Sequence, residues 1–288
     1  MTTEKVLSGK PYMATIVLAA AVVALGGCCT APSCGDGKCA KAPPCAWSGK
    51  RVAVFGDSIS DARLKMWRHW WQWVADDLGT KMSVYAANGT QWDNVPRQLD
   101  KMAQDDPDGV DAILIFMGTN DFNSNKPLGE WWNETEETVN RNGRMVKVKR
   151  RLPSQDAKTV RGRINIALGR IKSEYPRCQI VLLTPIRRGF FTCSERNVQP
   201  EDSYSNELGL YVGDYARVVR EAGEVWSVPV IDTYSESGLL LSMPSFSDCC
   251  NRATNDRLHP GTEGCRRLAL TVAARLKTLP PTFRMDGE

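Results

Sequence analysis

Two short segments near opposite ends of the chain carry residues that could perform nucleophilic catalysis together. Ser58 follows an apolar run at 51–55, and His259 lies three residues after the carboxylate of Asp256. A serine hydroxyl attacks a carbonyl only when a base removes its proton, and the base works best when a third group orients it. The chain has 2 histidines. The other, His69, lies among tryptophans in a helix-like segment, where a structural role is expected, so the base is predicted to be His259.

The elements that must position these residues follow a regular order. Short runs rich in Val, Ile and Leu predict strands at 51–55, 82–86, 112–117, 179–183 and 228–231. Helix-like stretches lie at 61–78, 95–105, 157–174, 205–222 and 262–276. The strand segments lack polar alternation, which is typical of parallel strands buried on both faces. This order predicts an α/β fold, a three-layer α/β/α sandwich around a doubly wound, parallel, five-stranded sheet.

Three candidate site residues directly follow predicted strands. Ser58 comes after the first strand, Gly89 after the second and Asn120 after the third. In open α/β sheets, reactive groups gather outside the carboxyl ends of the strands. We therefore expect these three residues at one edge of the sheet.

One segment, 122–156, is too long for a simple connection between a strand and a helix. Within it, Asn142-Gly143 separates two strand-like arms, which predicts a β-hairpin with a type I′ turn over 138–148. We expect an insertion at the rim of the site. Its basic residues between 141 and 151 fit either a solvated strand edge or a surface that recognises an anionic glycan or lipid headgroup.

Four strings in this order resemble the SGNH (GDSL-type) hydrolase family. They are Gly56-Asp57-Ser58, Asn88-Gly89-Thr90, Gly118-Thr119-Asn120-Asp121 and Asp256-Arg257-Leu258-His259-Pro260. The resemblance spans 50–276. An α/β-hydrolase is the nearest alternative, but its Gly-x-Ser-x-Gly elbow would need a second glycine where Ser60 stands.

The resemblance implies a flavodoxin-like sheet and a role for each matched residue. Ser58 is the expected nucleophile, His259 the general base and later the general acid, and Asp256 the group that orients His259. The oxyanion hole is expected to consist of the backbone N–H groups of Ser58 and Gly89 and the side chain of Asn120. Such a site uses neither a metal nor an organic cofactor.

The substrate follows less directly from the sequence. We expect a serine esterase that removes a short acyl group, such as acetyl, from a carbohydrate, with Trp92, Trp131 or Trp132 stacking on a sugar ring. The alternatives are a lipid esterase, a lysophospholipase or a thioesterase. A tethered binding protein that keeps the fold without turnover is the alternative from another class.

The first residues resemble an export signal. Lys5 and Lys10 precede an uncharged run at 13–25, which is too short to span a bilayer, and Leu25-Gly26-Gly27-Cys28 follows. This pattern resembles a bacterial lipoprotein signal peptide at 1–27, with Cys28 as the lipidated residue; an ordinary signal peptide or an anchor helix is the alternative. We expect a Cys- and Pro-rich tether at 28–48, a hydrolase domain at 49–280 and a tail at 281–288. The expected location is the bacterial cell envelope, at the outer membrane.

Charge and cysteine content exclude some classes of protein. A formal charge of +4 is too small to indicate nucleic-acid binding. The spacing of the cysteines in the tether matches no zinc site, so disulfides are expected in an exported chain. Of the 10 cysteines, Cys28 is expected to carry lipid, and an odd number remains. Their pairing and the oligomeric state stay open.

Overall fold

The computed structural model describes residues 45–65, 68–194, 197–250 and 256–283. The predicted signal peptide, Cys28 and most of the predicted tether lie outside these residues. No helix in the described ranges is long and apolar enough to cross a membrane. Within these ranges, no disulfide joins any two of Cys45, Cys178, Cys249, Cys250 and Cys265.

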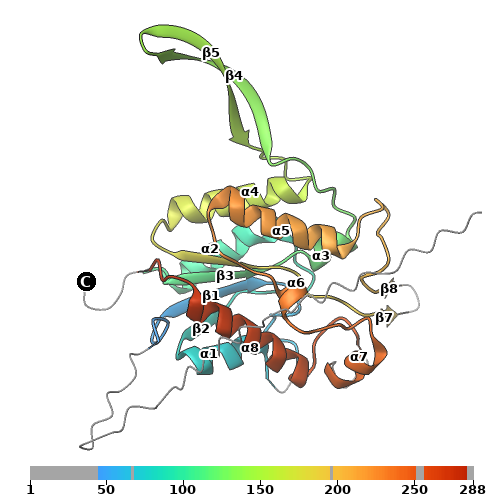
Figure 1. Ribbon diagram of the computed structural model, residues 1–288. Helices are drawn as coiled ribbons and strands as arrows, with labels where there is room; N and C mark the ends of the chain where they lie inside the picture. The colour runs from blue at the N-terminus through green and yellow to red at the C-terminus, as the bar shows by residue number, and fades with distance from the viewer. Residues whose placement is uncertain (1–44, 66–67, 195–196, 251–255, 284–288) are drawn as a thin grey trace, which may run out of the picture. The chain divides into compact units, whose positions relative to one another are not determined.

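A five-stranded parallel sheet forms the centre of the domain, as predicted (Figure 1). Its strand order is β2-β1-β3-β6-β9. The strands are β1 (Arg51–Gly56), β2 (Lys81–Val84), β3 (Ala112–Phe116), β6 (Gln179–Leu183) and β9 (Val230–Ile231). The chain passes from β1 outward to β2 and then returns to the other side of β1. This change of direction leaves a crevice at the carboxyl ends of β1 and β3, where open α/β sheets bind their ligands.

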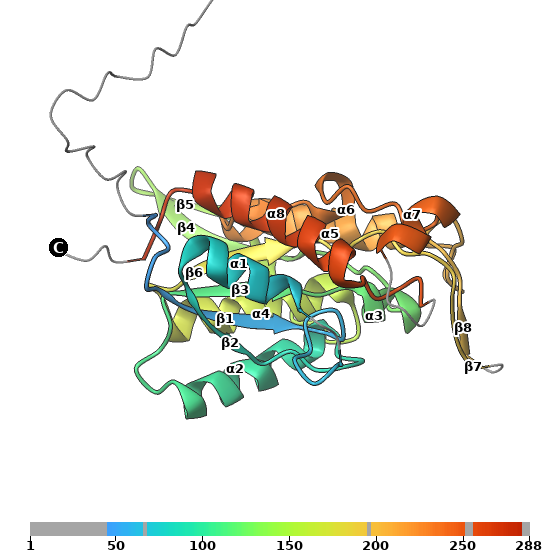
Figure 2. The same cartoon turned by 90° about the horizontal axis from the view of Figure 1, so that it is seen from below.

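Helices cover both faces of the sheet, which makes three layers (Figures 1 and 2). One face packs against α1 (Trp70–Leu78) and α8 (Thr262–Thr278), and the other against α2 (Val95–Asp105), α4 (Val160–Glu174) and α5 (Val212–Trp226). All five residues of β3 are buried. They alternate between the two cores, because successive side chains of a strand point to opposite faces. This explains why the strand is apolar without alternation.

Shorter elements complete the described fold. These are the 3₁₀ turn η1 (Trp92–Asn94), helices α3 (Thr119–Asn123), α6 (Thr233–Glu236) and α7 (Pro244–Cys250), and strands β7 (Phe191–Ser194) and β8 (Asn197–Gln199). Strands β7 and β8 form a small antiparallel pair of their own. None of them is predicted from the sequence, because each is too short to show a hydrophobic period.

The predicted hairpin is present and longer than expected. Strands β4 (Trp132–Arg141) and β5 (Arg144–Pro153) pair in antiparallel register and extend away from the sheet beyond α4 (Figure 1). The turn residues Asn142 and Gly143 have φ angles of 53° and 79°, as a type I′ turn requires. Most hairpin side chains are exposed on both faces. Carboxylates of β4 neutralise part of the basic cluster, since Glu134 contacts both Lys149 and Arg151.

Two predicted helices begin well after their expected first residue. Helix α1 begins at Trp70 rather than at 61, and α5 begins at Val212 rather than at 205. In each case a polar side chain near the expected start binds backbone N–H groups. Asp61 accepts from Arg63 and Asn88, and Asn206 accepts from Leu208 and Leu210. Such local bonds compete with helix formation.

The folded domain extends beyond both predicted boundaries. Trp47, predicted in the tether, is 1% exposed, and its indole Nε1 donates to the carbonyl oxygen of Leu276 at 2.9 Å. Phe283, predicted in the tail, is 4% exposed and packs edge-on against Trp47, with ring centroids 5.0 Å apart. Residues 45–48 and 281–283 therefore belong to the domain, because Trp47 and Phe283 are buried and pack against each other.

Candidate active site

The candidate site residues lie in loops that leave the carboxyl ends of the central strands. Ser58 follows Gly56, the last residue of β1, which pairs in register with the last residue of β3. Gly56 is tied to two neighbouring elements. Gln98 of α2 accepts from its N–H and donates to its carbonyl oxygen, and the hydroxyl of Thr90 also donates to that oxygen, at 2.8 Å. These bonds fix the point where the chain turns toward Ser58.

Ser58, His259 and Asp256 form a continuous hydrogen-bonded chain. The Oγ atom of Ser58 lies 2.7 Å from Nε2 of His259, and Nδ1 of His259 lies 2.5 Å from Oδ2 of Asp256. An ionised carboxylate only accepts hydrogen bonds, so Nδ1 carries the hydrogen and the Nε2 lone pair faces the serine hydroxyl. The arrangement can therefore remove a proton from Ser58.

Asp256 is held as an acceptor by the loop that carries His259. Its Oδ1 atom accepts from the backbone N–H groups of Leu258, at 2.9 Å, and of His259, at 3.1 Å. Burial alone would raise the pKa of Asp256, but the bond and the charge of His259, together with these N–H groups, outweigh it and hold the pKa below its ordinary value. The carboxylate consequently stays ionised in the pH range where a histidine can act as a base.

Three hydrogen-bond donors come from the loops around Ser58. The backbone N–H groups of Ser58 and Gly89 donate to no other residue in the described ranges. Gly89 has a φ of 77°, a conformation that glycine adopts without strain. One N–H of the Asn120 side chain donates to the carbonyl oxygen of Thr90 at 3.0 Å, which fixes the amide and leaves its second N–H. Donors in such loops can stabilise a developing oxyanion.

The model of the GDSL-like Lipase/Acylhydrolase family matches residues 54–267. This range includes Ser58, Asp256 and His259. The chain belongs to this family. It is therefore an ester hydrolase.

Solved structures share the fold of this chain. One crystal structure is 26% identical, with a TM-score of 0.63, and the match covers 81% of this chain and 99% of that one. A protein from Lactobacillus plantarum is 22% identical, with a TM-score of 0.62 and coverage of 80% and 98%. A possible lipase from Chitinophaga pinensis is 19% identical, with a TM-score of 0.58 and coverage of 79% and 98%. The last two show a shared fold. A comparison with curated proteins finds no match.

In this GDSL-like chain, a buried ion pair supports the loop of Asn120. The next residue, Asp121, is fully buried and accepts from the backbone N–H of Trp92 at 3.1 Å and from Arg163 of α4 at 3.0 Å. Arg163 also contacts Gln91 at 2.7 Å. These bonds join the loop after β2 to the loop after β3 beneath the site. Arg163 is not predicted from the sequence, because nothing in its own helix marks it as different from a surface arginine.

The loop after β6 supports the segment of His259. The N–H of Gly189 donates to the carbonyl oxygen of Arg257 at 2.7 Å. A Cβ atom on Gly189 would lie 2.3 Å from the carbonyl oxygen of Leu241 and 2.7 Å from Cβ of Arg257, so only glycine fits. Its neighbour Arg188 is buried and binds Asn123 and Gln199. Burial lowers the pKa of Arg188 to about 10, although nearby Asp202 and Asp256 oppose the change. The sequence offers no signal for either residue.

Asp57 of the first family string lies within the core. It accepts from the backbone N–H of Ile59 at 3.0 Å, and burial raises its pKa to about 6, partly opposed by that bond and by the charge of His259. Its described contacts hold the turn that follows β1.

The predicted sugar-stacking tryptophans do not surround Ser58. Trp92 is 0% exposed and packs in the core, so its prediction as a substrate contact is wrong. Trp131 donates from its indole to Glu221 at 2.9 Å and lies against Arg161, on the side of α4 and α5. Trp132 is half-buried at the start of β4. Aromatic residues in this chain serve mainly the core, which sequence spacing alone does not reveal.

Proposed function

We propose that this ester hydrolase is a serine esterase in which Ser58 is the nucleophile, His259 the general base and Asp256 the group that orients the base. The observation that carries the proposal is the hydrogen-bonded chain from Ser58 Oγ through both ring nitrogens of His259 to Asp256. A binding protein would have no need of such a chain.

The proposed reaction begins with attack of Ser58 Oγ on the ester carbonyl carbon, while its proton moves to Nε2 of His259. The carbonyl oxygen becomes an oxyanion, which accepts from the N–H groups of Ser58 and Gly89 and from Asn120. The negative charge of Asp256 stabilises the imidazolium. His259 then returns the proton to the leaving alkoxide, and the alcohol departs from the acyl-serine.

Water completes the proposed cycle by the same steps. His259 Nε2 accepts a proton from water, whose oxygen attacks the acyl carbon and forms a second oxyanion. Collapse of this intermediate breaks the bond to Ser58 Oγ, which takes the proton from His259. The products are one carboxylic acid and one alcohol, so no redox partner is needed.

For the substrate and location we propose a short acyl ester, such as an acetyl group on a carbohydrate, met in the cell envelope. Support comes from the N-terminal pattern that ends in Leu25-Gly26-Gly27-Cys28, with Cys28 proposed as the lipidated residue. Labelling with radioactive palmitate in a bacterial host tests the anchor. The wild-type protein should incorporate label and Cys28→Ser should not. Equal labelling of both proteins would refute the anchor at Cys28.

The activity is tested with the full chain purified in detergent and 4-nitrophenyl acetate, butyrate and octanoate as substrates. We expect turnover that decreases with acyl length and that is lost in Ser58→Ala. A fluorophosphonate probe should label the wild type at Ser58. Preference for octanoate would instead support a lipid esterase. Turnover that persists in Ser58→Ala would refute the nucleophile assignment.

A further inference from the structure

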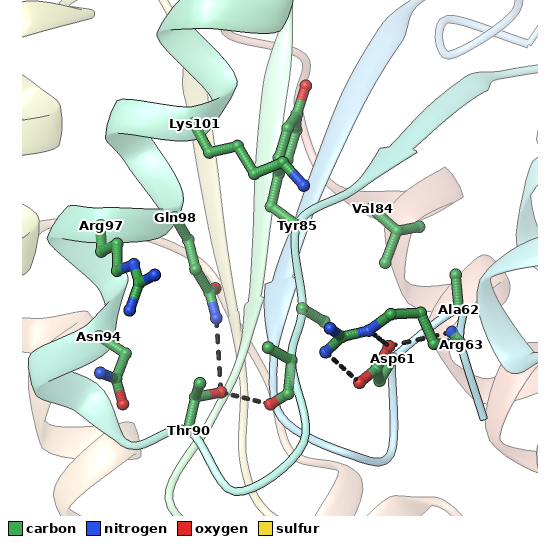
Figure 3. Close-up of a pocket in the computed structure, with 12 residues that line it drawn as sticks. Asp61, Ala62, Arg63, Val84, Tyr85, Thr90, Asn94, Arg97, Gln98 and Lys101 are labelled. Atoms are coloured by element: carbon green, nitrogen blue, oxygen red, sulfur yellow. Dashed lines mark hydrogen bonds and ion pairs between the residues drawn. The ribbon is translucent and has the colours of Figure 1, made fainter.

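A cavity of about 360 Å³ lies between helix α2, the end of strand β2 and the loop that follows Ser58 (Figure 3). It is lined by Asp61 and Arg63 from the loop, by residues 84–87 at and after the end of β2, and by one face of α2. The mechanism above uses none of these side chains. The volume suits a small molecule or one part of a larger ester.

The cavity is continuous with the loops that carry the proposed oxyanion donors. Asp61 lies three residues after Ser58, and its Oδ2 atom accepts from the N–H of Asn88, the residue before Gly89. Thr90, the residue after Gly89, lines the cavity. Consecutive Cα atoms are about 3.8 Å apart, so a molecule in the cavity lies beside the oxyanion donors.

Cationic side chains enter the cavity from two sides. Arg97 and Lys101 lie four residues apart on α2, which places them on one helix face. Figure 3 shows Arg97 and Lys101 directed into the space, with Arg63 opposite them. Arg97 and Lys101 are exposed, so a ligand can reach them from solvent.

The charges in the cavity do not balance. Asp61 is the carboxylate of the lining, and Arg63 already binds it through two bonds of 2.9 and 2.7 Å. The carboxylates nearest to them in sequence, Asp93 and Asp100, pair with Arg163 and Arg170 instead. No ion pair among the described residues includes Arg97 or Lys101. Two positive charges therefore remain beside the proposed catalytic serine, and they favour a ligand with a negative charge.

The rest of the lining is mainly apolar. Ala62, Val84, Ala86 and Ala87 present hydrocarbon, and the hydroxyl of Tyr85 is occupied by a hydrogen bond to Asp106 at 2.8 Å. These apolar side chains would not stabilise a fully hydrated ion. The cavity thus fits a short hydrocarbon segment that ends in an anionic group.

We propose that this cavity is a specificity site for an anionic group, a carboxylate or a phosphate, carried by the ester substrate. The inference rests on the proposed function and narrows its substrate class. A carboxylate would come from the far end of the acyl chain, and a phosphate from the alcohol. Arg97 and Lys101 bind the group, while the ester carbonyl lies at Ser58.

Two pairs of substrates distinguish these sources. The acyl pair is 4-nitrophenyl hexanoate and 4-nitrophenyl hydrogen adipate, which have the same chain length and differ in a terminal carboxylate. The alcohol pair is 1-acetylglycerol and 1-acetylglycerol 3-phosphate. Hydrolysis of this pair is measured as release of acetate. In one pair we expect kcat/KM about tenfold higher for the anionic member, from two partly exposed ionic contacts. The preference should weaken at high salt.

A double variant, Arg97→Gln/Lys101→Gln, should lose this preference through a higher KM, with kcat nearly unchanged, because the lost contacts do not touch the reacting atoms. The matched control is Arg144→Gln/Lys147→Gln in the hairpin, which removes the same charges elsewhere. The control should keep the preference. An equal loss in both double variants would overturn the proposal, because it would reflect net charge alone.

A binding measurement separates this inference from the proposed function. In Ser58→Ala, calorimetry with adipate and with glycerol 3-phosphate should detect binding of one probe, weakened about tenfold by Arg97→Gln/Lys101→Gln. Equal turnover within both substrate pairs, with neither probe bound, would overturn the anionic site and leave the esterase intact. If wild type hydrolysed none of the esters, the proposed function would fail, and the calorimetry would still decide the cavity.

Discussion

Replacement of Asp256 by asparagine separates the orienting role of this residue from its role in holding the loop. In the wild type, the N–H groups of Leu258 and His259 lie 2.9 and 3.1 Å from Oδ1 of Asp256. In Asp256→Asn, the amide oxygen can still accept hydrogen bonds from both groups. The amide NH₂ then takes the place of Oδ2, 2.5 Å from Nδ1 of His259. Two donors cannot face each other, so the imidazole must carry its hydrogen on Nε2 instead.

The consequence for catalysis is large, because a protonated Nε2 cannot accept the proton of Ser58. A triad with the wrong histidine tautomer loses about 10⁴ in kcat. This loss corresponds to about 5.4 kcal/mol of transition-state stabilisation. Hydrolysis of 4-nitrophenyl acetate at pH 7.5 measures it, and urea-induced unfolding should show little change in stability.

Asp256→Ala is the control for the loop. It removes the acceptor for both N–H groups as well, so we expect a similar loss of kcat together with a lower free energy of unfolding, by about 1–3 kcal/mol. If Asp256→Asn kept more than a tenth of the wild-type kcat while folded, the tautomer argument would be refuted, and with it the proposed role of Asp256.

Three further outcomes test separate parts of the structure. Asn120→Ala should lower kcat about 10²–10³-fold with a small change in KM, since it removes one donor to the oxyanion; unchanged kcat would remove Asn120 from the proposed oxyanion hole. Trp47→Ala should lower the free energy of unfolding in urea by about 3–5 kcal/mol without changing kcat of the folded protein; a loss below about 1 kcal/mol would place residues 45–48 outside the cooperative domain. Asp57 has a pKa raised to about 6 by burial, so the folded state holds its proton more tightly than the unfolded chain. The stability contributed by Asp57 should therefore fall as pH rises from about 4 to 6, and Asp57→Asn should gain about 3 kcal/mol relative to wild type across that range; parallel pH profiles of the two proteins would contradict the burial argument.

The sequence predicts the sheet well because its signals are local and strong. The segment 179–183 matches β6 residue for residue, and 95–105 matches α2. The hairpin turn at Asn142-Gly143 is also predicted, since positive φ at both positions favours this pair of residues. Helix starts are less predictable, because the side chains of Asp61 and Asn206 bind backbone groups in turns that compete with a helix.

The candidate site is predictable in its central residues and not in their supports. Ser58, Asp256 and His259 lie within hydrogen-bonding distance, as the order of the family strings indicates, while their catalytic roles remain a proposal. Arg163 and Gly189 contact the site loops only through the tertiary fold. Their own neighbours in sequence carry no trace of those contacts. The same limit explains the error on Trp92, whose burial depends on residues far along the chain.

The hydrogen bond between Ser58 and His259 joins residues 201 positions apart. Ser58 lies in the loop after β1, and His259 lies just before helix α8. A growing chain therefore carries Ser58 long before it carries a base that could activate the hydroxyl. The nucleophile stays unreactive until His259 has been synthesised and its ring lies against Ser58. Recovery of esterase activity during refolding would then report the joining of these two segments, which formation of the sheet alone does not provide.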